Sequence, residues 1–227
     1  MPQRNIFSWN SIISVLTKLS YVDDAAKIFY SMPEGDQCSW NSIISRFAQQ
    51  DRFDEALHYF VRMHRENFVL NEYSFCSVLS ACYGLKDIKL GAQVHALISK
   101  TRFFSNVYTG LALVDMYEKC GNVSCGQKAF DYMSERNRVS WNSLITCYEQ
   151  NDSASAALQV FLSMMDCGIE PDEITFSSMV SACVSLSAIK EGKQIHARVV
   201  KYNKLRDDLV LGNALVDMYA KCNKIKS

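Results

Sequence analysis

The residue types best suited to chemistry in this chain are nine cysteines and four histidines. A zinc-dependent deaminase needs an H-x-E and a C-x-x-C motif, and His64-Arg65-Glu66 supplies only the first half. No two cysteines stand at the C-x-x-C spacing, and the sequence carries neither a nucleophile–base set nor a glycine loop that could cradle phosphate. We therefore predict no enzymatic activity, no cofactor and no metal. His64 and Glu66 are interpreted as a chance pairing on a helix surface.

The remaining candidates for reactive groups recur at equivalent places in the sequence. Cys82 matches Cys183, and Cys120 matches Cys222, each within a repeated phrase. His95 and His196 likewise occupy matching G-x-Q-x-H segments, whereas His58 stands alone. Since the paired cysteines fall where an apolar helix face is expected, they are predicted to be reduced thiols of the core and not disulfides. The matching histidines are predicted to be structural.

A seven-residue phrase organises the chain because it occurs three times. Residues 8–14 are SWNSIIS, residues 39–45 repeat this phrase, and residues 140–146 are SWNSLIT. The segment FCSVLSAC at 75–82 also returns as FSSMVSAC at 176–183. Units of about 35 residues therefore follow one another in tandem. We expect one array over residues 1–227, with 1–5 as the tail of a preceding unit, full units at 6–36, 37–71, 72–106, 107–137, 138–172 and 173–208, and a partial unit at 209–227.

Within a unit the apolar residues have helical spacing. In 138–172 a stripe at i, i+3, i+4 and i+7 runs from Trp141 to Tyr148, and a second stripe follows a polar break. Gly121 and Asn223, each directly after a cysteine, are expected to end first helices in the left-handed conformation. Each unit is thus predicted to be a helical hairpin. Because one hairpin cannot bury both stripes, stacking predicts an all-α fold, an α-solenoid of tandem helix-turn-helix repeats, of either hand.

Composition limits the classes of partner. The chain is 48% apolar, which indicates a folded protein, and no apolar run reaches the roughly 18 residues that a membrane span requires. Lys and Arg together number 24, equal to Asp and Glu, so the formal net charge is zero. The chain therefore has no overall positive field that would attract nucleic acid non-specifically, and a polyanion would have to be held by local contacts.

Several segments together resemble a known family. These segments are SWNSIIS, LVDMYEKC at 113–120, and the G-x-Q-x-H segments at 91–95 and 192–196. They resemble the pentatricopeptide repeat family, in particular its plant organellar branch with alternating short, standard and long motifs, the PLS type. The resemblance implies a right-handed superhelix that binds single-stranded RNA, one base per repeat. It also implies a location in the mitochondrion or chloroplast and a role in RNA editing, processing or stabilisation. RNA-editing or processing factors are then the expected protein partners, with no membrane and no small-molecule substrate.

The same resemblance implies which side chains contact RNA. The residue after the aromatic in each first helix would face a base, because an amide offers a donor and an acceptor to the base edge, and the last residue of the unit would orient it. The implied base-reading residues are Asn10 with Asp36, Asn41 with Asn71, Asn142 with Asp172, Ser177 with Asp208, and Asn213. Base packing is assigned to Phe7, Cys38 and Val139, and phosphate contact to Lys18, Lys119 and Lys221.

Two units depart from this pattern, and two alternatives stay open. Leu111 at the reading position of 107–137 cannot hydrogen-bond a base, and Cys76 in 72–106 is a weak donor. The implied footprint is 5′-U-Y-N-N-U-N-3′. Alternatively, the asparagines and lysines could simply be solvated helix residues. The array could also be a helical-repeat scaffold for protein–protein interaction, since tetratricopeptide arrays use the same hairpin. The recurrence of asparagine after the aromatic favours RNA.

Overall fold

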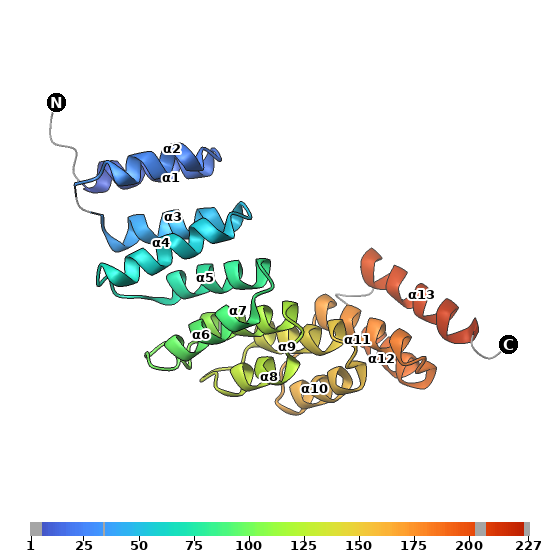
Figure 1. The fold of residues 1–227 in the computed structure, drawn as a ribbon. Coiled ribbons are helices and arrows are strands. Elements are labelled where there is room, and N and C mark those ends of the chain that lie inside the picture. The colour runs from blue at the N-terminus through green and yellow to red at the C-terminus, as the bar shows by residue number, and fades with distance from the viewer. Residues whose placement is uncertain (1–5, 34, 203–207, 225–227) are drawn as a thin grey trace. The chain divides into compact units, whose positions relative to one another are not determined.

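The computed structural model describes residues 6–33, 35–202 and 208–224, with the side chains of 223 and 224 left out. The described part is entirely α-helical (Figure 1). Its thirteen helices are α1 (Ile6–Lys18), α2 (Val22–Tyr30), α3 (Gln37–Gln49), α4 (Phe53–Arg65), α5 (Glu72–Gly84), α6 (Ile88–Ile98), α7 (Val107–Lys119), α8 (Val123–Asp131), α9 (Arg138–Gln150), α10 (Ala154–Asp166), α11 (Glu173–Ser185), α12 (Ile189–Lys201) and α13 (Leu209–Lys224). None of these helices is long and apolar enough to cross a bilayer.

The helices form two compact units, residues 1–120 and 121–227. In the first unit α1, α3, α5 and α7 pack side by side in sequence order, and α2, α4 and α6 each pack against the first helix of their own hairpin and of the next one. In the second unit α9, α11 and α13 form the corresponding series, and α8, α10 and α12 play the part of second helices. Within each unit, this arrangement confirms the predicted stacking of helical hairpins. The predicted tail at 1–5 lies outside the described residues.

Large apolar side chains between successive hairpins form the core. Trp40, Phe47 and Phe75 in the first unit, and Phe161 and Phe176 in the second, are each at most 2% exposed. Burial of a side chain of this size contributes roughly 1.5–3 kcal/mol. In two of the three SWNS phrases the aromatic, Trp40 or Trp141, is thus a core residue, which holds the polar residue that follows it at the edge of the core, whereas Trp9 is half-buried.

Every hairpin turn uses one residue in the left-handed region, two positions after the first helix ends. Their φ values are all positive: Ser20 (66°), Asp51 (57°), Lys86 (53°), Gly121 (71°), Asp152 (55°) and Ser187 (53°). In the α5–α6 turn the N–H of Asp87 reaches the carbonyl of Cys82 at 3.0 Å, as in a Schellman motif. The prediction for Gly121 is confirmed. The prediction for Asn223 is wrong because α13 continues through it to Lys224, and an asparagine tolerates a left-handed cap without requiring one.

The first helices begin at aspartate or asparagine N-caps. Asp36, Asn71 and Asp172 each accept a hydrogen bond from the backbone N–H three residues later, at 2.8, 3.1 and 3.0 Å. Asn137 caps α9 in the same way at 3.0 Å, and Asp208 accepts from the N–H of Leu211 at 2.8 Å. The last residue of a predicted unit is therefore also the cap of the next unit's first helix.

The turns give a first test. Replacing Lys86 with glycine should raise the free energy of unfolding by about 1 kcal/mol, because glycine adopts positive φ without the steric cost that a side chain brings. The matched change Gly121→Ala should lower it by a similar amount, since a Cβ there would meet only Asn151 Oδ1, at 3.7 Å, so the cost is conformational and not steric. Urea unfolding followed by circular dichroism measures both. A destabilised Lys86→Gly variant would contradict this account of the turns.

The caps give a second test, on pH. The pKa values of Asp36 and Asp172 are both lowered from 3.8: burial opposes ionisation, but hydrogen bonds from the backbone N–H of the capped helix and from an asparagine amide outweigh it. A carboxyl with a lowered folded-state pKa stabilises the fold above its unfolded pKa, and this contribution is lost as pH falls through the folded pKa.

The double variant Asp36→Asn, Asp172→Asn should therefore be less stable than the wild type at neutral pH. The difference should shrink as the pH falls below 3.8. Asn71 shows that a neutral amide can cap the same helix position, so the variant should fold. Urea unfolding across pH measures the gap, and a gap that stays constant at acid pH would contradict the assignment.

Candidate nucleic-acid interface

Three asparagines donate hydrogen bonds across the boundary between successive hairpins. The Nδ2 of Asn10, on α1, lies 3.0 Å from each carboxylate oxygen of Asp36, the N-cap of α3. The Nδ2 of Asn142 lies 2.9 Å from Asp172 Oδ1. A weaker contact of 3.3 Å joins Asn41 Nδ2 to Asn71 Oδ1. The structure thus brings together the three asparagine pairs named from the sequence.

The orientation of two of these amides follows from the chemistry of their partners. An ionised carboxylate can only accept hydrogen bonds, so the NH₂ group must face Asp36 or Asp172 and the carbonyl oxygen must point away. Each carboxylate is in turn held by the N-terminus of the next helix, through the N–H of Ser39 or Thr175. The amide is therefore oriented by a cap that belongs to the following unit.

The three amide oxygens differ in their surroundings. Asn10 Oδ1 and Asn41 Oδ1 are buried and have no hydrogen-bond partner among the described residues. Asn142 Oδ1 instead lies 2.6 Å from the hydroxyl of Thr175. Asn10 and Asn41 are half-buried, whereas Asn142 is only 7% exposed. Asn142 is thus less accessible than a groove-lining side chain was expected to be.

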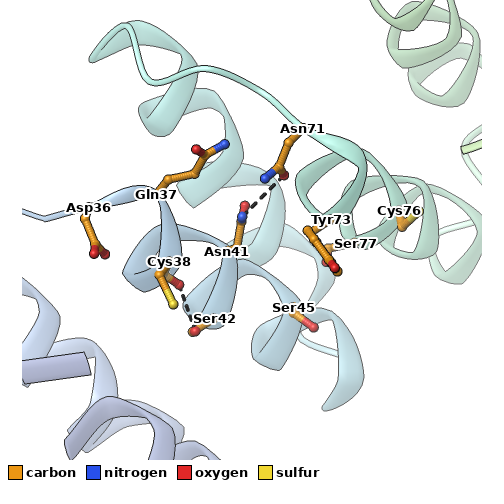
Figure 2. A pocket seen from close by; sticks show the side chains of 10 residues that line it. All are labelled: Asp36, Gln37, Cys38, Asn41, Ser42, Ser45, Asn71, Tyr73, Cys76 and Ser77. Atoms are coloured by element: carbon orange, nitrogen blue, oxygen red, sulfur yellow. Dashed lines mark hydrogen bonds between the residues drawn. The ribbon is translucent and has the colours of Figure 1, made fainter. Parts of the chain in front are cut away.

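A cavity of about 840 Å³ surrounds the second pair (Figure 2). Figure 2 shows Asn41 in the middle of it, with its amide directed at Asn71, and Cys38 and Tyr73 on either side. The serine hydroxyls of Ser42, Ser45 and Ser77 complete a mixed polar and apolar wall. The cavity combines an amide that can pair with a base edge, an aromatic ring that can stack, and hydroxyl groups that can accept or donate.

Apolar side chains are exposed at the same position of the first turn in every unit. We call these seven residues the packing row: Phe7, Cys38, Tyr73, Tyr108, Val139, Ile174 and Val210. Phe7 is 78% exposed and Tyr108 is 69% exposed. Sequence reasoning named Phe7, Cys38 and Val139 and missed the other four, although their register, three residues before the reading position, would have identified them. Large apolar groups exposed at a repeated position indicate a binding surface.

At the other predicted base-reading positions in the described part of the chain, no asparagine amide is held by the cap of the following repeat. Cys76 donates to the carbonyl of Tyr108 at 3.6 Å, and burial, with the negative charges of Glu72 and Asp115, raises the pKa of its thiol to about 11. Leu111 is half-buried and apolar. Ser177 is half-buried, and its assigned partner Asp208 accepts from the N–H of Leu211 at the start of α13. Asn213 is exposed on α13.

The three lysines named for phosphate contact occupy one position near the end of their first helices and are exposed. Lys119 Nζ lies 2.9 Å from the Glu118 carboxylate, and this hydrogen bond, with the attraction between the charges, raises the pKa of Lys119. Lys221 Nζ lies 2.7 Å from Asp217. A phosphate at either position would share the lysine with a carboxylate, whereas Lys18 has no recorded ion pair among the described residues.

Of the paired cysteines predicted for the core, Cys82, Cys183 and Cys222 are buried, whereas Cys120 is half-buried. His95 Nδ1 lies 2.8 Å from the hydroxyl of Tyr117, and the equivalent His196 lies 2.9 Å from that of Tyr219. Burial lowers the pKa of His95. His64 is exposed on α4, and Glu66 accepts a hydrogen bond from Arg62 at 2.7 Å. In the described parts of the chain, no three histidine, cysteine or acidic residues are grouped as a metal site would require.

Comparisons with known proteins agree with this geometry. The model of the PPR repeat family matches residues 35–84 and 136–185, and the PPR repeat model matches residues 7–36. A pentatricopeptide repeat-containing protein of Arabidopsis thaliana is 62% identical over 226 residues, which cover 100% of this chain and 32% of the relative. A mitochondrial pentatricopeptide repeat-containing protein of the same plant is 34% identical over 98% of this chain and 22% of its own length.

Solved structures show the same fold. The crystal structure of the pentatricopeptide repeat protein PPR10 from maize superposes with a TM-score of 0.84 at 19% identity, covering 99% of this chain and 32% of that one. PPR10 in complex with an 18-nt psaJ RNA element gives a TM-score of 0.81 at 20% identity, covering 99% and 34%. The chain spans about a third of the length of the first of these relatives. With its matched repeats, its relatives and its stacked hairpins, the chain belongs to the pentatricopeptide repeat family.

Proposed function

We propose that the chain binds single-stranded RNA along its first helices, with one base facing each repeat. The observation that carries this proposal is the asparagine held by the cap of the following repeat, because it presents an oriented amide at a regular interval. The packing row supports it, since exposed aromatic and aliphatic side chains on either side of the amide can stack on bases. The RNA-bound structure of PPR10, which has the same fold, supports it further.

The proposed footprint is 5′-U-Y-N-N-U-N-3′, assigned to the repeats from 6–36 to 173–208 by the family's pattern. Asn10 with Asp36 and Asn142 with Asp172 would face uridine, and Asn41 with Asn71 would face a pyrimidine. Ser177, Asp208 and Asn213 would contribute weakly, and Lys18, Lys119 and Lys221 would contact phosphate. Three specified bases cannot select a single transcript, so we infer that selection requires further repeats in the whole protein.

In the cell we propose a role in organellar RNA editing, processing or stabilisation, with other factors providing the chemistry. This proposal rests on relatives that are named mitochondrial or chloroplastic and on the alternating motif lengths of the PLS type. A protein-interaction scaffold remains the second candidate on the strength of the hairpin architecture alone. A partner captured equally well after RNase treatment would favour the scaffold.

The footprint can be tested with two 12-nucleotide RNAs at a stated salt concentration. One carries U-Y-N-N-U-N, and the other has both uridines changed to guanosine. We expect the first to bind about ten- to a hundredfold more tightly by fluorescence anisotropy, because each of the two mismatched amide pairings costs about 0.7–1.4 kcal/mol. Equal affinity for the two RNAs would exclude the base assignments.

The packing row can be tested separately. Tyr73→Ala should weaken binding of the matched RNA about tenfold, since stacking of a base on an aromatic ring is worth roughly 1–3 kcal/mol. Tyr21→Ala is the matched control, because Tyr21 is also exposed, at 58% against 66% for Tyr73, but precedes a second helix. If the two variants lost affinity to the same extent, the packing row would not be the stacking surface.

A further inference from the structure

At the caps of α3, α5, α9 and α11, the hydroxyl side chain three residues later takes one of two directions. Ser39, Ser74 and Ser140 each donate to the backbone carbonyl of their cap residue at 2.8 Å. Thr175, at the same position of the 173–208 repeat, instead places its Oγ1 2.6 Å from Asn142 Oδ1. The 138–172 and 173–208 repeats therefore differ at this boundary from the other two asparagine pairs.

Two acceptors lie near the Thr175 hydroxyl, and Asn142 Oδ1 is the nearer, at 2.6 Å against 2.9 Å for Asp172 Oδ1. Asn142 donates its NH₂ group to Asp172 at 2.9 Å, so the atom facing Thr175 is the amide oxygen, which carries no hydrogen. Two oxygens at 2.6 Å repel each other unless a proton lies between them, and only the hydroxyl can supply it. The stiff χ1 of a β-branched side chain favours one such direction, whereas a serine rotates more freely.

This hydrogen bond lowers the binding free energy that a base can gain by pairing with the asparagine. No protein donor among the described residues reaches Asn10 Oδ1 or Asn41 Oδ1, so a base N–H that reaches either oxygen displaces no protein hydrogen bond. Asn142 Oδ1 is already satisfied and its side chain is 7% exposed. A base at the 138–172 repeat must share or displace the Thr175 hydroxyl, so it gains less from the same Asn–Asp pair.

We propose that Thr175 is a positioning residue that occupies the carbonyl oxygen of Asn142 and so lowers base discrimination by the 138–172 repeat below that of the 6–36 repeat. The inference rests on the proposed RNA binding. It assigns to the third residue of the following repeat an influence on how strongly the preceding asparagine discriminates between bases.

A reciprocal exchange tests it. For each protein the ratio of the Kd for G to the Kd for U is measured at the base facing 6–36 and, separately, at the base facing 138–172. In the wild type, the ratio measured at the base facing 6–36 should be larger than the ratio measured at the base facing 138–172. Thr175→Ser should raise the ratio at 138–172 by roughly two- to tenfold and leave the other unchanged, and Ser39→Thr should lower the ratio at 6–36 by a similar factor. Unchanged ratios in both variants would overturn the proposal.

Two controls separate this role from general effects on folding or binding. Ser140→Thr makes the same substitution where the preceding repeat carries Leu111, which has no amide, so both ratios should stay unchanged. In RNA-free protein with labelled asparagine, Thr175→Ser should shift the 13Cγ signal of Asn142, and Ser140→Thr should not. If the 13Cγ chemical shift of Asn142 were the same in Thr175→Ser and in the wild type, the hydrogen bond between Thr175 and Asn142 would be excluded. A shifted signal without any base discrimination in wild type would overturn both the RNA footprint and the influence of Thr175 on it.

Discussion

The contact on which the proposed interface depends is the hydrogen bond between an asparagine of one hairpin and the residue that caps the next. The cap is fixed by the N-terminus of its own helix, because Asp36 accepts the backbone N–H of Ser39 at 2.8 Å. Asn10 is held in turn because its Nδ2 lies 3.0 Å from both oxygens of that carboxylate. One carboxylate thus begins a helix and orients an amide. The stacking of hairpins and the presentation of polar groups are therefore two consequences of the same few residues, and a change in the spacing between repeats would disturb both.

The hairpin geometry is maintained with little help from glycine. Each turn places a residue in the left-handed region, and in five of the six turns that residue carries a side chain, such as Lys86 or Ser187. The cost of that conformation is offset by burial on either side, where rings such as Phe75 and Phe176 are fully enclosed. A stack held by apolar contacts between neighbouring hairpins leaves the second residue of each first helix exposed. These exposed residues include Tyr108 and Val210.

Much of the fold and of the candidate site could be predicted from the sequence, because a repeated phrase fixes the register of every unit. Helical spacing around Trp141 was enough to predict the hairpins, and the resemblance to the pentatricopeptide repeat family implied which partners Asn10, Asn41 and Asn142 would meet. The sequence could not show that Asn142 is buried or that its amide oxygen meets the Thr175 hydroxyl, because both depend on how side chains of neighbouring repeats pack. Nor could it show that Lys119 and Lys221 are engaged by carboxylates, because those contacts depend on side-chain rotamers. The end predicted at Asn223 failed because a residue that tolerates a helix end does not impose one.

The most direct test of the central claim is photo-crosslinking of RNA that carries a single 4-thiouridine, with the attached peptides identified by mass spectrometry. When the modified base is placed opposite the 6–36 repeat, the account predicts attachment at the start of α1 or α3, near Phe7 or Cys38. When it is moved to the base opposite 138–172, attachment should move to the start of α9 or α11, near Val139 or Ile174. Attachment to second helices such as α4 or α10, or a pattern that does not move with the modified base, would contradict the claim that the first helices align an RNA strand.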